Sequence, residues 1–242
     1  MAYQAVFKRF ELKYLLTTEQ KQRILQAMEP YMALDQYGRT TIRNVYLDTA
    51  NYRLIRRSIE KPAYKEKIRL RSYRRAGNGC DIFVELKKKC RGVVFKRRLT
   101  LPEELALAWA RGDRPAEQTS QIADEIDYFI RFYGTVKPAV YLCYDREAYY
   151  AKDGSDFRIT FDDTILCRRT DMTLDSDPSG TPILPEGMAL MEVKCAGGVP
   201  LWLTKVLTKE RIFKTSFSKY GTAYETLIYP NLKEETFHGS TV

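Results

Sequence analysis

The stretch YKEKIRLRSYRR, residues Tyr64–Arg75, decides how this sequence folds. Three cations, Lys67, Arg69 and Arg71, recur at every second position, with isoleucine and leucine between them. Alternate side chains of a β-strand point to opposite faces, so the three cations share one face and the apolar pair the other. A helix would scatter the same cations around its circumference. The stretch therefore predicts a strand with one strongly basic face.

The same alternation recurs elsewhere, and the recurrence gives it weight. With 40 Lys and Arg among 242 residues, about one such triple is expected by chance. Charged residues also alternate with apolar ones at Glu11/Lys13, Glu85/Lys87, Lys96/Arg98, Arg158/Thr160/Asp162 and Glu192/Lys194. Two interpretations stay open: the polar face is turned to water, as in many antiparallel sheets, or it lines a closed barrel.

The remaining patterns predict an α+β fold dominated by an antiparallel sheet, organised as one domain over residues 1–242. The sequence contains no long linker and no internal repeat. Strands are expected over residues 5–15, 40–47, 64–75, 80–89, 92–100, 139–150, 155–161 and 188–195. Helices are expected over 17–28, from 102, and over 121–133, 201–213 and 218–228. A hairpin turn is expected at 77–79.

Composition excludes several classes of protein. The five cysteines are odd in number and never spaced as CxxC, which favours reduced thiols in a cytoplasmic protein over a disulfide framework or zinc site. No apolar run approaches the length of a membrane-spanning helix. The only histidine is His238. Lys, Arg, Asp and Glu must therefore carry the chemistry, and the formal charge of +9 points to an anionic partner.

If the polar face lines a barrel, its cations need counter-charges. Several Lys and Arg in one enclosed space would repel each other and lose hydration, at several kcal/mol per ion. Guanidinium forks and ammonium groups match phosphate oxygens, and carboxylates facing the same space would hold Mg²⁺ or Mn²⁺. The charge pattern therefore predicts a tunnel for a phosphate chain with a divalent metal.

These motifs resemble, in order, the VTC domain, the polyphosphate polymerase branch of the triphosphate tunnel metalloenzymes. They are FELKY at 10–14, VYLDT at 45–49, KIRLR at 67–71, ELK at 85–87, EVK at 192–194 and SKY at 218–220. The resemblance extends from about Phe7 to Tyr229. It implies an eight-stranded antiparallel β-barrel tunnel with surrounding helices.

The resemblance also implies a set of site residues. The expected phosphate ligands are Lys13, Lys67, Arg69, Arg71, Lys87, Lys96 and Arg146, with Arg158 and Lys194 as additional contacts and Lys219 at the tunnel mouth. Those expected to act in catalysis are Lys67, Arg69, Arg71, Lys87, Arg146 and Lys194. Glu192 is the best metal ligand, and Glu11 and Glu85 are candidates for binding metal or for orienting basic side chains.

The resemblance implies a metal-dependent polymerase that transfers the γ-phosphate of ATP onto a growing polyphosphate chain. The sister CYTH branch begins with Glu-x-Glu-x-Lys, whereas this sequence has Arg9 in the first position, which favours the VTC type. Phosphoryl transfer needs positioning and charge more than a histidine base. The alternatives are a triphosphatase of the same fold and a non-catalytic polyphosphate-binding module.

Other partners are less well supported by the sequence. Nucleic-acid binding is disfavoured because the cations follow strands and no zinc-finger or RNP pattern occurs. Eukaryotic polymerases of the family carry a regulatory domain and transmembrane helices, so a separate membrane partner is an open expectation. The oligomeric state is also open.

Overall fold

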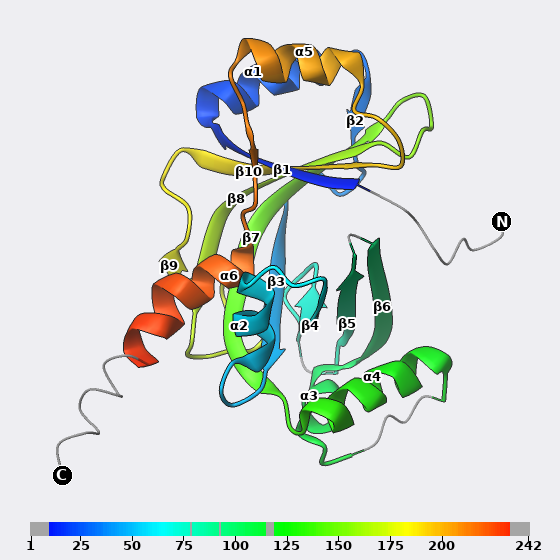
Figure 1. Cartoon of the computed structure of the whole chain (residues 1–242), viewed down its shortest axis with the longest axis vertical. Helices are drawn as coiled ribbons and strands as arrows, with labels where there is room; N and C mark the ends of the chain where they lie inside the picture. Colours follow the sequence, from blue (N-terminus) through cyan, green and yellow to red (C-terminus); the bar gives the residue numbers. More distant parts are fainter. Residues whose placement is uncertain (1–9, 78, 92, 115–118, 233–242) are drawn as a thin grey trace. The chain divides into compact units, whose positions relative to one another are not determined.

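The computed structural model describes residues 10–77, 79–91, 93–114 and 119–232 (Figure 1). The strands are β1 (Phe10–Thr17), β2 (Met32–Leu34), β3 (Thr40–Asp48), β4 (Tyr64–Ser72), β5 (Asp81–Cys90), β6 (Val93–Pro102), β7 (Lys137–Ala151), β8 (Arg158–Arg168), β9 (Thr181–Pro182), β10 (Met188–Cys195) and β11 (Lys214–Thr215). The helices are α1 (Thr18–Met28), α2 (Arg53–Ile59), α3 (Glu103–Arg111), α4 (Gln121–Tyr133), α5 (Leu201–Lys209) and α6 (Lys219–Ala223), followed by the π-helical segment η1 (Tyr224–Ile228).

The strands form one sheet in the order β11-β1-β10-β8-β7-β3-β4-β5-β6, with β2 paired to β7 and β9 to β8. The α+β class and the antiparallel pairing predicted from the sequence are confirmed. The expected closed, eight-stranded barrel is wrong on two counts: the described residues form eleven strands, and their order has two ends, at β11 and β6.

Both errors have a physical reason. Each of the eight predicted runs overlaps one strand, and the three additional strands have only two or three residues. A strand that short has no alternation to detect. Alternation also assigns residues to a face, but it does not say which strands pair at the ends of the sheet.

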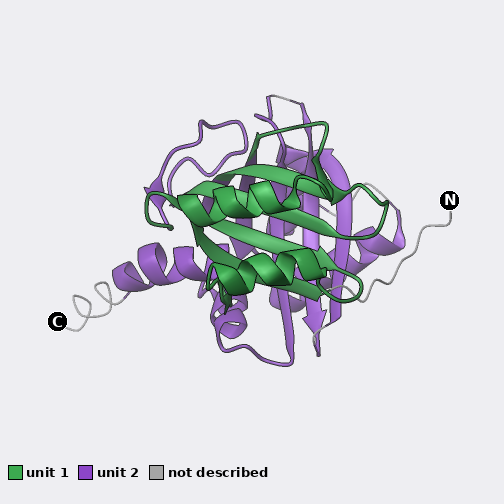
Figure 2. Ribbon diagram, turned by 90° about the horizontal axis from the view of Figure 1, so that it is seen from above, with its two compact units in different colours: residues 1–41, 144–165, 184–217 green, residues 42–143, 166–183, 218–242 purple. Residues whose placement is uncertain are grey.

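The chain divides into two compact units, each built from separate segments (Figure 2). Unit 1 comprises Met1–Thr41, Tyr144–Ile165 and Leu184–Phe217, and unit 2 comprises Ile42–Cys143, Leu166–Ile183 and Ser218–Val242. The expectation of a single domain over residues 1–242 stays a prediction.

In unit 1, helices α1 and α5 cover one face of β1 and β10 (Figure 1). Leu16, Ile24, Met191 and Leu203 are buried in this core. Thr17 starts α1 through a capping box, because its hydroxyl accepts from the Gln20 N–H while the Gln20 side chain accepts from the Thr17 N–H. One face of β1 and β10 is thus apolar, which leaves their alternate residues on the other face.

In unit 2, helices α3 and α4 pack on the apolar face of β4, β5 and β6 (Figure 1). Ile68, Leu70 and Leu86 from the strands meet Trp109 from α3 and Phe129 from α4 in this core. The predicted helix at 121–133 matches α4 in both bounds. The cations that alternate with these apolar residues therefore lie on the opposite face of the same strands.

Helix α2 has no counterpart among the predicted elements. Tyr52, its N-cap residue, has a left-handed backbone with a φ of 56° and makes no side-chain cap. The buried Asp48 carboxylate supplies the cap instead, accepting from the N–H groups of Leu54 at 2.9 Å and Ile55 at 3.0 Å. The acceptor that starts the helix thus stands at the end of a strand and not next to the helix.

The cysteines form no disulfide among the described residues. Cys80, Cys90, Cys143, Cys167 and Cys195 are free thiols. Within the described part of the chain, no helix is long and apolar enough to cross a membrane. Arg9, Asn78 of the predicted hairpin turn and His238 lie outside the described residues.

Candidate functional site: two polar faces

The polar face of β4, β5 and β6 in unit 2 carries most of the predicted phosphate ligands. Strand register places its residues opposite one another in three rows. The rows are Lys67–Lys87–Lys96, Arg69–Glu85–Arg98 and Arg71–Phe83–Thr100, and these nine residues are called the basic face below. Like charges opposite each other destabilise a sheet. A face with six cations and one carboxylate is therefore short of negative charge.

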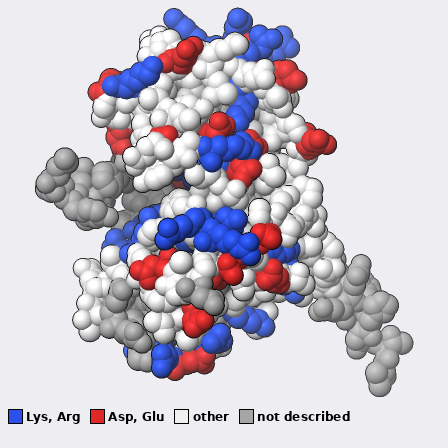
Figure 3. All heavy atoms as spheres, turned by 180° about the vertical axis from the view of Figure 1, so that it is seen from behind, with Lys and Arg blue, Asp and Glu red and all other residues white. Residues whose placement is uncertain are grey.

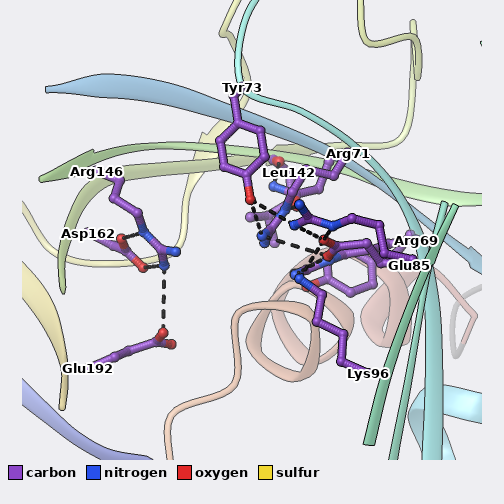
Figure 4. A network of polar contacts seen from close by, with 12 residues as sticks. Arg69, Arg71, Tyr73, Glu85, Lys96, Leu142, Arg146, Asp162 and Glu192 are labelled. Carbon is purple, nitrogen blue, oxygen red and sulfur yellow. Dashed lines mark hydrogen bonds and ion pairs between the residues drawn. The ribbon is translucent and has the colours of Figure 1, made fainter. Parts of the chain in front are cut away.

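Glu85 is the counter-ion at the centre of the basic face (Figure 4). Its side chain is 1% exposed, and Arg69 Nη2 lies 2.7 Å from Oε2 while Lys96 Nζ lies 2.6 Å from Oε1. Arg98 contacts Oε1 at 2.5 Å, and Arg71 lies 3.7 Å from Oε2. Burial alone would raise the pKa of this carboxyl, but Arg69, Arg71 and Lys96 hold it well below its usual range. Both of its oxygens already face cations.

The guanidinium groups of Arg69 and Arg71 are fixed from β3, the neighbouring strand. Arg69 Nη1 donates to the Tyr46 hydroxyl at 3.0 Å, and Arg71 Nε donates to Asn44 Oδ1 at 3.0 Å. The Asn44 amide is itself held, because it donates to the Leu142 carbonyl at 3.0 Å. Burial would raise the pKa of Tyr46, yet the nearby Arg69 and Arg71 lower it. Two of the predicted phosphate ligands are therefore rigidly placed.

The Ser218-Lys219-Tyr220 motif lies beside this cluster. Lys67 Nζ donates to the Ser218 hydroxyl at 3.0 Å, and Ser218 also caps α6 by accepting from the Gly221 N–H at 3.2 Å. Tyr220 donates to Asp48 at 2.9 Å, which ties α6 to the cap of α2. Lys219 is 8% exposed, and its charge contributes to the lowered pKa of Tyr46. Lys219 thus belongs electrostatically to the same cluster.

Lys96 has an altered affinity for its proton. Burial lowers the pKa of its ammonium to about 8, despite the opposing effect of Glu85. Arg69 and Arg98 act in the same direction as burial. A further anion next to Lys96 would favour its charged form.

The polar face of β1, β10 and β8 in unit 1 has a different pattern of charge. Register gives two rows, Lys13–Glu192–Thr160 and Glu11–Lys194–Arg158, called the checkered face below together with Arg146 and Asp162. Lys13 Nζ lies 3.2 Å from Glu192 and 3.6 Å from Glu11. Lys13 and Lys194 each lie opposite a carboxylate, and Arg158 lies opposite Lys194. The checkered face is therefore nearly balanced in charge.

Arg146 forms a buried, bidentate ion pair in unit 1 (Figure 4). Its Nε and Nη2 atoms each lie 2.6 Å from one oxygen of Asp162, which is 0% exposed, and Nη2 lies 3.6 Å from Glu192. Burial alone would lower the pKa of Arg146, but Asp162, Tyr144 and Glu192 raise it well above its usual value. The bidentate pair fixes the plane of the guanidinium group.

The deeper part of the checkered face contains polar atoms that lack partners. The Thr160 hydroxyl and Arg158 Nε are buried, and neither has a hydrogen-bond partner among the described residues. Burial lowers the pKa of Lys194 to about 8, with Glu192 opposing the shift. These groups indicate a place that water or a ligand oxygen would occupy.

The carboxylates of unit 1 fit a divalent cation whose remaining coordination positions are filled by phosphate oxygens and water. Glu11 and Glu192 flank the same ammonium, that of Lys13. Mg²⁺ at phosphate sites commonly takes one or two carboxylates and completes its shell with water and phosphate oxygens. Among the described residues no group of three or more His, Cys, Asp or Glu side chains is arranged to hold a metal. A two-carboxylate site completed by phosphate is therefore the arrangement that this donor set allows.

The structure adds residues to those predicted. Arg98 and Tyr73 join the cluster around Glu85, and Asp162 orients Arg146. Strand alternation contains the signal for all three, since Arg98 is two residues from Lys96, and Tyr73 and Asp162 continue the runs that begin at 67 and 158. In a space-filling view, Lys and Arg gather in dense patches with Asp and Glu at their borders (Figure 3).

Comparison with known proteins gives one family and a shared fold. The model of the VTC domain family matches residues 8–228. No curated protein matches the chain significantly. A candidate adenylate cyclase from Bacillus halodurans is 13% identical, over 89% of this chain and 96% of that one, with a TM-score of 0.55. A candidate adenylate cyclase from Vibrio parahaemolyticus is 11% identical over 90% and 98%, with a TM-score of 0.46. The first likeness shows a shared fold.

Proposed function

We propose that this chain, which belongs to the VTC domain family of the triphosphate tunnel metalloenzymes, is a polyphosphate polymerase that transfers the γ-phosphate of ATP onto a growing phosphate chain. The observation that carries the proposal is the excess of cations on the basic face, where six cations share one carboxylate. A linear polyphosphate has about one negative charge per phosphate and repeats its oxygens at short intervals, so it matches rows of cations better than a single anion does.

In this proposal the basic face binds and positions phosphates. Arg69 and Arg71, held by Tyr46 and Asn44, offer guanidinium groups whose orientation is fixed before the ligand arrives. The lysine row Lys67–Lys87–Lys96 supplies point charges. Because Glu85 already faces four cations, we assign it as the residue that orients them and not as a metal ligand.

The checkered face is proposed to bind phosphate through its cations and metal through its carboxylates. Arg146 and Arg158 supply guanidinium groups, and Lys13 and Lys194 supply ammonium groups, whereas Lys219 is proposed to bind phosphate beside the basic face of unit 2. Glu192, with Glu11, would hold the metal. A bound Mg²⁺ or Mn²⁺ supplies neutralisation of charge on phosphate oxygens. The side chains align the acceptor phosphate with the γ-phosphorus of ATP and stabilise the negative charge that develops on the leaving ADP.

Incubation of the purified chain with ATP and Mn²⁺ tests the proposal. A polymer detected by gel staining and by the ³¹P resonance of internal phosphates is the expected product. Release of inorganic phosphate without polymer would indicate the triphosphatase instead, and tight binding of tripolyphosphate without turnover would indicate the binding module. No product and no tripolyphosphate binding across metals would refute all three.

Adjacent lysines on β5 provide a matched pair of variants. Lys87 lies in the lysine row of the basic face, whereas Lys88 is on the opposite face, 3.9 Å from Glu125. Lys87→Ala is expected to weaken tripolyphosphate binding roughly tenfold, by loss of one charge-assisted contact. Lys88→Ala removes the same charge and should leave binding unchanged. Equal effects of the two variants would contradict the assignment of the face.

Glu192→Gln tests the assigned metal ligand. The variant keeps the size of the side chain and removes its charge, so a higher concentration of Mn²⁺ is expected for half-maximal activity. Glu186→Gln, at an exposed position, is the control. An unchanged Mn²⁺ dependence in the Glu192 variant would exclude it as a ligand.

A further inference from the structure

Tyr73 stands at the margin of the basic face, two residues beyond Arg71. Its ring packs edge-on against Phe83, with centroids 5.7 Å apart. The guanidinium carbons of Arg71 and Arg98 lie 5.7 Å and 5.8 Å from the centre of the Tyr73 ring. The phenol is thus held between two cations, yet the residue is 41% exposed.

The Tyr73 hydroxyl accepts hydrogen bonds but donates none to a described residue. A phenol can accept through its oxygen and donate one proton. Arg98 Nη2 donates to this oxygen at 3.0 Å, and Arg71 Nη1 approaches it at 3.5 Å. Guanidinium groups have no acceptor atom, and no described residue accepts the Tyr73 proton. The proton is therefore available to an acceptor that comes from outside.

We propose that the Tyr73 hydroxyl donates to a phosphate oxygen of the bound anion, between Arg71 and Arg98. An oxyanion attracted by the two guanidinium groups would accept the hydrogen bond of the Tyr73 hydroxyl, which the guanidinium groups cannot accept. Tyr73 then adds a hydroxyl donor of fixed position between the two guanidinium groups, whereas the lysines supply flexible point charges. This inference rests on the proposed binding of polyphosphate to the basic face.

The electrostatics of the site make the contact dependent on pH. Partial burial would raise the pKa of the Tyr73 phenol, and Glu85 acts in the same direction, but Arg71 and Arg98 outweigh both and lower it to about 8. Above that pH the phenolate has no proton to donate and repels the phosphate. Lys96 loses its charge in the same range, so the pH dependence of affinity alone does not identify Tyr73.

The absorbance of tyrosinate gives a direct measurement. The full chain is titrated from about pH 6.5 to 9.5, with and without tripolyphosphate and with no added metal, beside Tyr73→Phe. Tyr128→Phe is the control, because Tyr128 stacks on Phe132 in α4 and lies outside the basic face. Among the early ionisations of the free protein, which include that of Tyr46, one should be removed by Tyr73→Phe and kept by Tyr128→Phe. Tripolyphosphate should raise its midpoint by about one pH unit or more.

Binding measured by calorimetry separates the failure of this inference from failure of the proposed function. Tyr73→Phe is expected to bind tripolyphosphate roughly tenfold more weakly at neutral pH, as loss of a hydrogen bond to a charged group predicts. Tripolyphosphate binding with no shift of the early ionisation, or an early ionisation absent from the wild type, would overturn the role of Tyr73 alone. No binding by the wild type would overturn the proposed function with it.

Discussion

Replacing Glu85 by glutamine should destabilise unit 2 more than its single lost charge suggests. The carboxylate is 1% exposed and contacts Arg69, Lys96 and Arg98 at 2.5–2.7 Å, with Arg71 at 3.7 Å. Removing one member of a buried charge network typically costs about 3–5 kcal/mol, because the partners remain buried and unpaired. Lys96 and Arg98 are partly exposed, so solvent screens them, and we take the lower end, about 3 kcal/mol.

The assay is thermal and urea unfolding at low ionic strength. For a chain of this size, a loss of about 3 kcal/mol corresponds to a melting temperature lower by roughly 6–12 °C. Glu125→Gln is the matched control in the same unit. Glu125 pairs with Arg97 at 2.8 Å but its side chain is 24% exposed, so the loss should be about 0–1 kcal/mol.

Anions should reverse much of the defect. Without Glu85 the basic face is more positive by one charge, so tripolyphosphate should raise the melting temperature of Glu85→Gln more than that of the wild type. High salt should also narrow the difference between them, by screening the cations. The reasoning is refuted if Glu85→Gln unfolds within about 1 kcal/mol of Glu125→Gln at low salt. It is equally refuted if neither salt nor tripolyphosphate restores stability.

Three further predictions follow from the two faces. Because the folded-state pKa of Glu85 is depressed, its contribution to stability is present above the unfolded pKa of about 4.3 and is lost as the pH falls below it; urea unfolding should show that Glu85→Gln flattens this acid limb, and parallel curves would contradict the assignment. Asp162→Asn should lower the free energy of unfolding by about 3–5 kcal/mol, since Arg146 stays buried without its bidentate partner; a loss below about 1 kcal/mol would contradict the pairing. Tripolyphosphate binding at about pH 8.5 should take up protons as Lys96 regains its charge; calorimetry in buffers of different ionisation enthalpy should show a smaller uptake for Lys96→Arg, and equal uptake would exclude Lys96 as the source.

Much of the fold could be predicted because its elements carry local signals. Helix α4 begins after the Ser120 cap, has apolar residues at helical spacing and ends at Gly134, so its bounds follow from adjacent residues. Helix α2 could not be predicted this way, because its cap comes from Asp48 at the end of a strand, and that carboxylate is held in turn by Tyr220 of α6. Strands β2, β9 and β11 are too short for periodicity and exist through their partners.

The site shows the same division between local and non-local information. Alternation predicted correctly that Lys67, Arg69 and Arg71 share a face, since that depends on one strand alone. It did not predict that Arg69, Glu85 and Arg98 stand in one row, because a row depends on the register between strands. The positions of the charges along the chain therefore do not define the site until the register between neighbouring strands is known.

Register also explains how one repeated pattern gives two different faces. Both Glu85/Lys87 in unit 2 and Glu192/Lys194 in unit 1 are Glu-x-Lys pairs at the centre of three strands. In unit 1 the register sets Glu192 opposite Lys13, and Lys194 opposite Glu11, so opposite charges meet. In unit 2 it sets Lys87 between Lys67 and Lys96, so that like charges meet.

The consequence is that the shortage of negative charge is confined to one face of the sheet. A net charge of +9 would be harmless if it were spread over the surface, where water and salt screen it. On the basic face, the Arg69–Glu85–Arg98 row contains the only carboxylate of the nine residues, and the lysine row next to it has none. An anion bound along the lysine row would add to the counter-charge that Glu85 supplies to Lys96 from the row beside it. A bound phosphate chain should therefore stabilise the folded protein more at the lysine row than at the balanced checkered face.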